Sequence, residues 1–372
     1  MKSNAFLFIS LIALLSQAST LAASEQPAGT GQSKSKVYSH DQGFLAEFKK
    51  PLAVAGYKFV PGLTPTYHVR SYKITKSGKV LASDKCEQDG WDRQFGIVLP
   101  FATTKAINQM DLKSARFAKS DPFDWSETVF GVSLWKENKP VPGRLAPGTD
   151  VTGDGVPDLI VGYQPEGHYG YKATIYSLGS KFKKVMTVEG EDNPVYFKDV
   201  DGDGLFEVLA ADSTFNDFYC GYANAAKPRV IQRIKNNKLF LATDLMKGLK
   251  VSPNYLKKKV AEGKKIYAEG SKDGQTSADF IPFLTVEMLN LVYTGNADLA
   301  WKLLDQVWPL RAEQKMKMPG TLDPTERTKA QYLQEFKERL SKSPYWEGLQ
   351  ELNPKELAST KSRKKVLVKG CS

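Results

Sequence analysis

Two short acidic segments carry the side chains of this chain that are best suited to holding a metal ion. They run from Asp150 to Asp158 (DVTGDGVPD, the first loop) and from Asp199 to Glu207 (DVDGDGLFE, the second loop). Both place oxygen-bearing side chains at positions 1, 3, 5 and 9, with a glycine at position 6, where the chain must turn sharply. A calcium ion takes about 6–8 oxygen ligands. The alternate side chains, the carbonyl at position 7 and the carboxylate at position 9 can supply most of them, so the spacing predicts one calcium site in each loop.

Two other structures are compatible with part of this pattern. Asp, Asn and Gly dominate β-turns, so either segment alone could be a turn that binds nothing. The recurrence of the pattern with the same flanking residues argues against that interpretation. An EF-hand would need helices on both sides and a glutamate at position 12, where this chain has Val161 and Ala210.

Together with the apolar run that follows each loop, the pattern resembles the FG-GAP/VCBS-type repeats of integrin α-subunits and of many exported bacterial proteins. The resemblance covers residues 149–243. It implies that each repeat is one antiparallel β-unit, often a propeller blade, with structural calcium in its loop, and it implies a module rather than an activity. The ligands that it implies in the first loop are Asp150, Thr152, Asp154, the Val156 carbonyl and Asp158. In the second loop they are Asp199, Asp201, Asp203, the Leu205 carbonyl and Glu207.

The two loops depart from the family pattern in different ways. Thr152 leaves the first loop one carboxylate short, and Glu207 stands where the family usually has an aspartate. Because the second loop has more carboxylates, we expect it to bind calcium more tightly than the first.

The segments that must position these loops have the pattern of β-strands. Each loop leads directly into an apolar strand, at residues 159–163 or 208–211, and two more strands follow in each case, at residues 171–176 and 183–188 or at 229–234 and 238–243. The recurring order predicts metal-loop repeats at residues 149–188 and 198–243. Upstream, residues 67–81 predict a hairpin with a glycine turn, and residues 95–101 and 127–135 predict further strands.

The predicted fold class is α+β. Two repeats do not close a propeller, which typically has about 4–8 blades. The β-rich domain, residues 37–245, is therefore expected to be either an incomplete propeller or a curved sheet or sandwich, and we favour the second. A basic linker at residues 246–275, a helical domain at 276–353 and a basic tail at 354–372 are expected to follow, with helices over residues 281–293, 297–307 and 323–340.

The amino terminus predicts export. Lys2 is followed by an apolar stretch over residues 5–15 and by small residues at Thr20 and Ala22 that suit cleavage, so residues 1–22 have the pattern of a signal peptide. A flexible linker is expected at residues 23–36. The apolar stretch is short for a bilayer span, although an uncleaved anchor is the alternative. We expect an extracytoplasmic protein, periplasmic or secreted, without a transmembrane anchor after cleavage.

The net charge of the chain bears on the partners that it could bind. The formal net charge is +11, with lysine clusters at residues 257–259, 264–265 and 361–369 that either bind an anionic surface or are simply solvated. Nucleic acid is disfavoured by export and by the lack of a base-stacking motif.

Of the three cysteines, Cys86 and Cys220 are the more plausible disulfide pair because both lie in the β-rich region.

The sequence contains few signs of catalysis. It has no nucleophile elbow, no zinc-protease motif and no phosphate or dinucleotide loop, and it has only three histidines, His40, His68 and His168. We therefore assign no catalytic or cofactor-binding residue and expect a non-enzymatic binding or scaffold protein for a protein or carbohydrate of the cell envelope. The alternative is an extracytoplasmic hydrolase of envelope polysaccharide or peptide with structural calcium. It would use carboxylates such as Asp192, Asp212 and Asp217, or a pair near His168.

Overall fold

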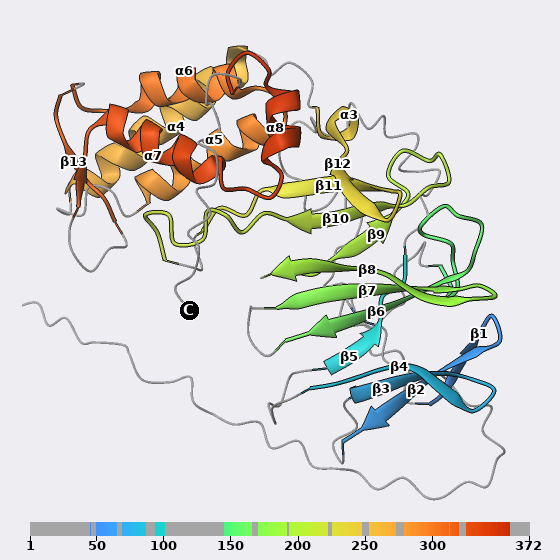
Figure 1. Cartoon of the computed structure of the whole chain (residues 1–372). Helices are drawn as coiled ribbons and strands as arrows, with labels where there is room; N and C mark the ends of the chain where they lie inside the picture. Colours follow the sequence, from blue (N-terminus) through green and yellow to red (C-terminus); the bar gives the residue numbers. More distant parts are fainter. Residues whose placement is uncertain are drawn as a thin grey trace, which may run out of the picture. The chain divides into compact units, whose positions relative to one another are not determined.

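Three antiparallel sheets of four strands each follow one another along the first part of the chain (Figure 1). The computed structural model describes residues 45, 50–64, 69–86, 94–100, 145–165, 170–191, 193–221, 225–247, 253–272, 279–311, 313–319 and 325–357, all of them within the unit Tyr38–Ser372. In each sheet the strands lie side by side in chain order. The first sheet holds β1 (Leu52–Val54), β2 (Tyr57–Leu63), β3 (Val69–Lys76) and β4 (Lys79–Lys85). The second holds β5 (Gln94–Ile97), β6 (Asp158–Gln164), β7 (Tyr171–Leu178) and β8 (Phe182–Glu191), and the third holds β9 (Tyr196–Lys198), β10 (Glu207–Ala211), β11 (Arg229–Lys235) and β12 (Lys238–Leu241).

Strands form at most of the predicted positions within the described residues, because apolar runs and turn residues are local signals, but β1, β2 and β9 were not predicted. The first five residues of β6 and the first four of β10 are all buried, as expected for strands covered on both faces. The β3–β4 hairpin turns at Ser77 and Gly78, and the β11–β12 hairpin turns at Asn236 and Asn237; all four residues have positive φ angles, between 49° and 80°. Such turns match the right-handed twist of the strands that they join.

The sheets pack in succession through three clusters of buried side chains. One cluster joins the first sheet to the second and includes Phe59, Ile74 and Leu159. Another joins the second sheet to the third through Ile175 and Val208. The third and largest cluster joins the third sheet to the helices. The second and third sheets are thus covered on both faces, which accounts for the apolar character of their central strands.

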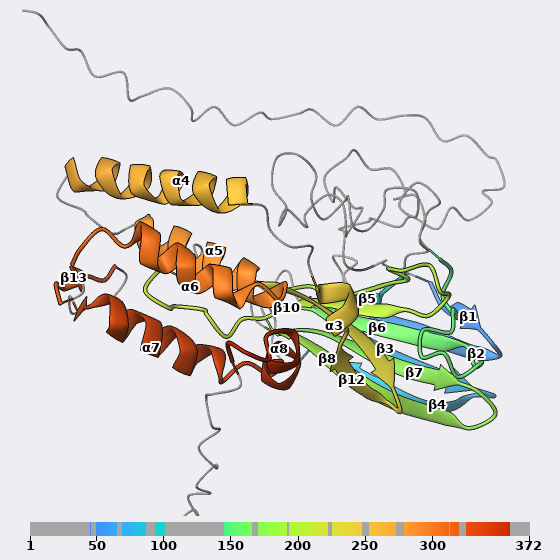
Figure 2. The ribbon, with the colours of Figure 1, turned by 90° about the horizontal axis from the view of Figure 1, so that it is seen from above.

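Helices make up the second part of the chain, so the order of the elements agrees with the α+β class. They are α3 (Thr243–Met246), α4 (Pro253–Lys272), α5 (Phe280–Tyr293), α6 (Ala297–Val307), α7 (Lys329–Leu340) and α8 (Trp346–Leu352), with a short ladder of β13 (Met316–Lys317) and β14 (Glu326–Arg327) before α7. Figure 2 shows α5 and α6 between α4 and α7. In the part of the chain that the structure describes, no helix has the length and the apolar character needed to cross a membrane, and no closed propeller is formed.

The helix boundaries follow local signals where these exist. Gly295, with a φ of 76°, ends α5, and α6 begins two residues later. Helix α7 begins at a capping box between Thr328 and Gln331, later than the expected start at residue 323. The expected start relied on Pro324, which lies outside the described residues.

The segment at residues 246–275, which we expected to be a basic linker, instead contains the 20-residue helix α4. The helix has a narrow packing face that includes Val260 and Gly263, and the many exposed lysines make this face hard to recognise in the sequence. A Cβ atom at Gly263 would lie 2.4 Å from the side chain of Val307, so α4 and α6 approach closely there. Lys259 is buried and forms a 2.7 Å ion pair with Glu287 of α5.

One expectation about side chains is corrected by the packing. No disulfide joins Cys86 to Cys220. Cys86 packs between the first and second sheets, whereas Cys220 follows the third sheet's β10, so the two lie in different layers.

Several expectations concern residues outside the described ranges. They are the signal peptide at 1–22, the linker at 23–36, the strand at 127–135, the three histidines, Asp192, Cys371 and the tail from residue 358.

Candidate metal centre

The two acidic loops occupy corresponding places in the second and third sheets. The first loop leads into β6, and its last residue, Asp158, is the first residue of that strand. The second loop joins β9 to β10, and its last residue, Glu207, is the first residue of β10. Strands β6 and β10 are both second strands of a four-stranded meander; the repeat itself stays a prediction from the sequence.

The aspartate at position 1 holds each loop in the same way. The Asp150 carboxylate accepts hydrogen bonds from the amides of Gly153 at 2.8 Å and Gly155 at 2.7 Å. Asp199 accepts the equivalent bonds at 2.7 and 3.3 Å from the glycines at positions 4 and 6 of the second loop. All four glycines have positive φ angles, between 72° and 88°. Sequence reasoning used the glycine at position 6 but missed the one at position 4, although it is present in both loops.

The carboxylate at position 9 is buried in both loops and only half satisfied. Asp158 is 2% exposed and Glu207 is 0% exposed. One oxygen of each accepts the amide of the residue at position 2, Val151 at 3.0 Å and Val200 at 2.9 Å. The other oxygens, Asp158 Oδ1 and Glu207 Oε1, accept no hydrogen bond from the described residues. Buried polar atoms nearly always have a partner. Glu207 Oε1 lies 3.4 Å from Arg233 Nε, whereas Asp158 Oδ1 has no hydrogen-bond partner among the described residues.

Burial makes both carboxylates harder to ionise. It raises the pKa of Asp158 to about 6, against the lowering effect of hydrogen bonds from Thr152 and Val151. It raises the pKa of Glu207 to about 7, with a further rise from the charge of Asp201 and an opposing effect from Arg233. A divalent cation at either oxygen would reverse this shift by favouring the charged form.

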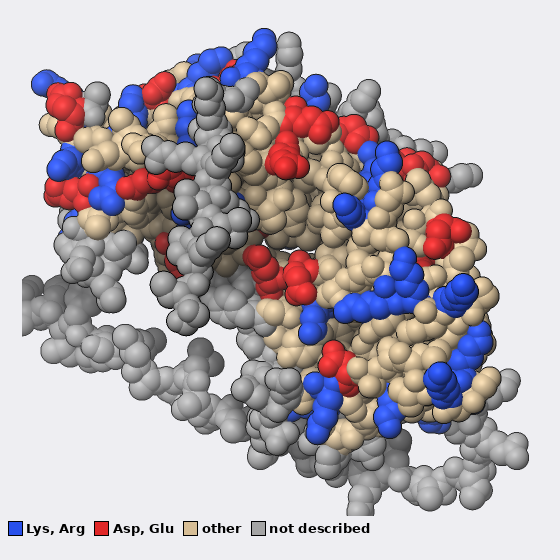
Figure 3. Space-filling view, in the orientation of Figure 1, with Lys and Arg blue, Asp and Glu red and all other residues tan. Residues whose placement is uncertain are grey.

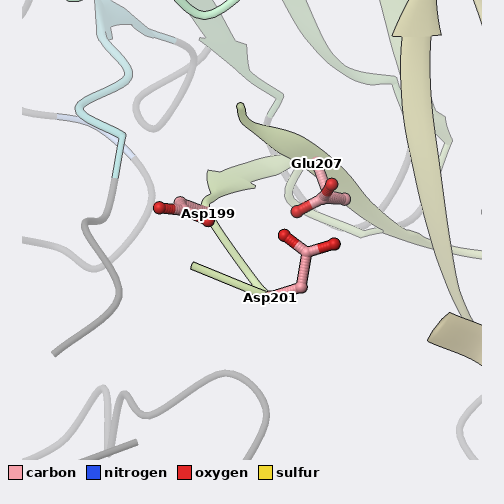
Figure 4. Close-up of side chains that lie close together, drawn as sticks. All are labelled: Asp199, Asp201 and Glu207. Atoms are coloured by element: carbon pink, nitrogen blue, oxygen red, sulfur yellow. The ribbon is translucent and has the colours of Figure 1, made fainter. Parts of the chain in front are cut away.

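The second loop brings three of its four acidic side chains to one focus. Carboxylate oxygens of Asp199, Asp201 and Glu207 lie within 4.8 Å of one another. Figure 4 shows the carboxylates of Asp201 and Glu207 turned toward each other, with Asp199 beside them. Asp203 is not part of this group; its Oδ1 accepts the amide of Leu205 at 2.8 Å. Leu205 itself is 52% exposed.

The first loop is tied more closely to its own hydroxyl and amides. The Thr152 hydroxyl donates to Asp158 Oδ2 at 2.9 Å and lies 3.4 Å from Asp150 Oδ1. Asp154 accepts the amide of Val156 at 2.9 Å, as its counterpart Asp203 does in the second loop. The three aspartates of this loop do not form an oxygen cluster of the kind seen in the second loop.

Comparisons with protein-family models, with curated proteins and with solved structures found no match to this chain. The resemblance to FG-GAP/VCBS-type repeats therefore stays a prediction that rests on the residues of the two loops.

Arg233 is a functional neighbour of the second loop that sequence reasoning missed. Its guanidinium lies 2.8 Å from Asp201 Oδ2, 3.4 Å from Glu207 Oε1 and 2.6 Å from Asp244 Oδ1. It reaches them because Arg233 on β11 pairs directly with Glu207 on β10. In the second sheet Ser177 takes the equivalent place opposite Asp158. The pairing of Arg233 with Glu207 can be recognised only once the strand register is known.

The residues of both loops suit a hard cation. They offer carboxylate, hydroxyl and carbonyl oxygens with no sulfur or imidazole, which is the donor set of calcium rather than of zinc or copper. A carboxylate has about four lone-pair sites, so an oxygen that accepts one amide can still bind a metal. The strongest sign of fit in the first loop is the buried Asp158 Oδ1, which has no hydrogen-bond partner among the described residues; in the second loop it is the convergence of three carboxylates within 4.8 Å.

Proposed function

We propose that this chain is an exported, calcium-stabilised binding or scaffold protein of the FG-GAP/VCBS type, with one structural calcium ion in each loop. The observation that carries the proposal is the hydrogen-bond arrangement that the two loops share, in which the position 9 carboxylate is buried with one oxygen unsatisfied. Burying a carboxylate at the same place in both loops is costly for a turn that binds nothing, even though Arg233 lies 3.4 Å from the Glu207 oxygen.

The succession of sheets supports a blade-like interpretation of the β-rich part. Each sheet is a four-stranded meander that packs face to face on the next, as blades do in a propeller. In place of the curved sheet or sandwich that the sequence favoured, we propose that they are three units of an open, incomplete propeller, with the helices covering the third sheet in place of a further blade. The first sheet turns from β1 to β2 through Ala55 and Gly56, which leaves no room for a metal loop there.

Calcium would act on the fold rather than on a substrate. In the first loop Asp150, Asp154, Asp158 and the Thr152 hydroxyl would hold it, and in the second loop Asp199, Asp201, Asp203 and Glu207 would do so, with the carbonyls of Val156 and Leu205. The ion would neutralise carboxylates that otherwise repel one another, so its binding energy would become folding energy.

Arg233 alters the expected difference between the two sites. The second loop has four carboxylates and the first has three, but the guanidinium of Arg233 opposes the negative charge of the second loop. Because Arg233 also pairs with Asp244 at 2.6 Å, it offsets only part of that charge, so we propose that it narrows the difference in calcium affinity between the two sites.

The test of this function is the response of thermal unfolding to calcium. Removing calcium from the wild type should lower the melting temperature, and adding it back should restore the value. Asp199→Asn with Asp203→Asn keeps side chains that can accept the loop amides but removes two charges, so it should abolish the contribution of the second loop. A melting temperature that does not respond to calcium in the wild type would refute the proposal.

The hydrolase alternative gains no specific support from the described residues. Asp212 accepts hydrogen bonds from Tyr293, from Ser343 and from the amide of Thr214, as a structural acceptor does. Asp192 and His168 lie outside the described ranges. We therefore propose no reaction. Export and the extracytoplasmic location are part of the proposal and rest on the pattern of residues 1–22.

A further inference from the structure

A cavity of about 480 Å³ opens where β8, the third sheet and α8 meet, away from the metal loops. Figure 3 shows a hollow between two groups of acidic side chains over this region. Its volume falls within the range of small-molecule sites, about 300–1,000 Å³. Gly348 of α8 allows the helix to approach the sheet, since a Cβ atom there would lie 2.6 Å from the side chain of Leu241.

The charge of the cavity is opposite to that of the protein. Glu189 and Glu191 flank Gly190 at a β-bulge near the end of β8, and both line the cavity. Glu347 and Glu351 lie four residues apart on α8 and share one face of the helix. All four are exposed and line the cavity, whose described lining contains no Lys or Arg, although the chain carries a net charge of +11.

The floor of the cavity adds a buried negative charge. Asp212 lines it and is 2% exposed. Its partners are the hydroxyls of Tyr293 and Ser343 and the amide of Thr214, all of them neutral donors. Tyr345 stands beside it, and burial followed by the charges of Asp212 and Glu191 raises the pKa of its hydroxyl. A negative field therefore converges on this space from the floor as well as from the rim.

The walls between the glutamates are apolar and aromatic. They include Leu239, Leu241, Pro344 and Tyr345, and they include Phe240, which is 51% exposed. An aliphatic chain can pack on such a surface while its charged ends reach the rim. The aromatic faces can also attract an ammonium group.

A single metal ion does not suit this arrangement. Among the described residues, the acidic groups that converge closely enough to hold a metal are those of the second loop, and none of the cavity glutamates belongs to that group. A ligand that pairs with the glutamates of both β8 and α8 must therefore carry positive charges at two separate places.

We propose that this cavity binds an elongated organic cation, an aliphatic chain with two or more ammonium groups. One end would pair with Glu189 and Glu191 and the other with Glu347 and Glu351, while the chain packs on the walls between them. A free polyamine and the lysine side chains of a basic peptide share this chemistry. The site is separate from the calcium loops, so this inference stands or falls independently of the proposed calcium function.

The test is calorimetric titration of the full chain with spermidine at low salt, in calcium-free buffer and again with calcium. The wild type should bind saturably. The variant Glu191→Gln/Glu347→Gln should bind about fivefold to tenfold more weakly, since two exposed ion pairs are lost. The matched control is Glu313→Gln/Glu338→Gln, which removes the same charge at exposed positions outside the cavity. It should bind like the wild type.

A second titration with an acetylated trilysine amide distinguishes the two sources. Saturable binding of spermidine alone assigns a free polyamine, and saturable binding of trilysine assigns a basic peptide; either result supports the site. If neither probe binds saturably, or if the cavity variant and its control weaken binding equally, the inference is wrong. The second result would mean that the probes respond only to overall charge.

Discussion

At the scale of single residues, the predictions for the two loops depend most on the buried carboxylates at position 9, Asp158 and Glu207. Sequence reasoning could assign Asp158 and Glu207 because ligand spacing within a loop is a local property. It could not show that one oxygen of each is buried without a hydrogen-bond partner, since that depends on packing against neighbouring sheets. It also missed Arg233, because its contact with Glu207 follows from the register of β10 on β11.

The raised pKa values of Asp158 and Glu207, about 6 and about 7, predict how stability depends on pH. In metal-free protein the folded state holds these protons more tightly than the unfolded state. Stability should therefore fall as the pH rises from about 4.5 to about 7, by on the order of 3 kcal/mol for each group. Saturating calcium should remove this fall, because it binds the charged form. Urea unfolding across this range measures both effects, and the fall should shrink by about half in Glu207→Gln. An equal fall with and without calcium would contradict the assignment.

Arg233 should act as a resident competitor of calcium in the second loop. Replacing it with glutamine removes a positive charge next to Asp201 and Glu207, so calcium affinity of that loop should rise about tenfold or more. The matched control is Lys235→Gln, an exposed residue of the same strand, which should leave affinity unchanged within about twofold. Calcium titration of both variants makes the comparison. Equal affinities in the two variants would show that Arg233 does not compete.

At the scale of elements, strands and turns were largely predictable and helix α4 was not. The strands of the two repeats have continuous apolar runs, and their turns use Gly or Asn at positive φ. Helix α4 has a narrow apolar face among many lysines, so its composition resembles that of a linker. Its position becomes clear only from the contact of Gly263 with Val307 and from the buried ion pair of Lys259 with Glu287.

The close packing of α8 on the third sheet can be tested by a single substitution. A methyl group at Gly348 would lie 2.6 Å from Leu241, so the helix and β12 would have to move apart. Gly348→Ala should therefore destabilise the protein by about 1–3 kcal/mol, although alanine alone favours a helix. Gly221→Ala is the control, since no atom lies within 4 Å of its added methyl group. Chemical denaturation measures both, and a Gly348→Ala variant at least as stable as the wild type would refute the close contact.

At the scale of the whole molecule, the sheets and helices share their cores. The largest cluster of buried residues runs from Leu209 and Ile231 of the third sheet to Leu284 and Phe336 of the helices. The sequence predicted the order of strands before helices, but not this shared core.

Because the core is shared, calcium should stabilise the helices as well as the sheets. Far-ultraviolet circular dichroism at the helical bands reports largely on that part, whereas tryptophan fluorescence combines three residues on or next to helices, Trp301, Trp308 and Trp346, with three that precede them, Trp91, Trp125 and Trp135. Both signals should melt in one transition, and both midpoints should rise together when calcium is added. A helical transition that ignores calcium would show that the two parts unfold separately.

The central claim is that two loops each hold one calcium ion, and calorimetric titration of metal-free protein with calcium tests it most directly. The wild type should bind two ions. Asp150→Asn/Asp154→Asn and Asp199→Asn/Asp203→Asn should each bind one, in the loop that was left intact. A wild type that releases no binding heat, or two loop variants that keep the stoichiometry of the wild type, would contradict the account.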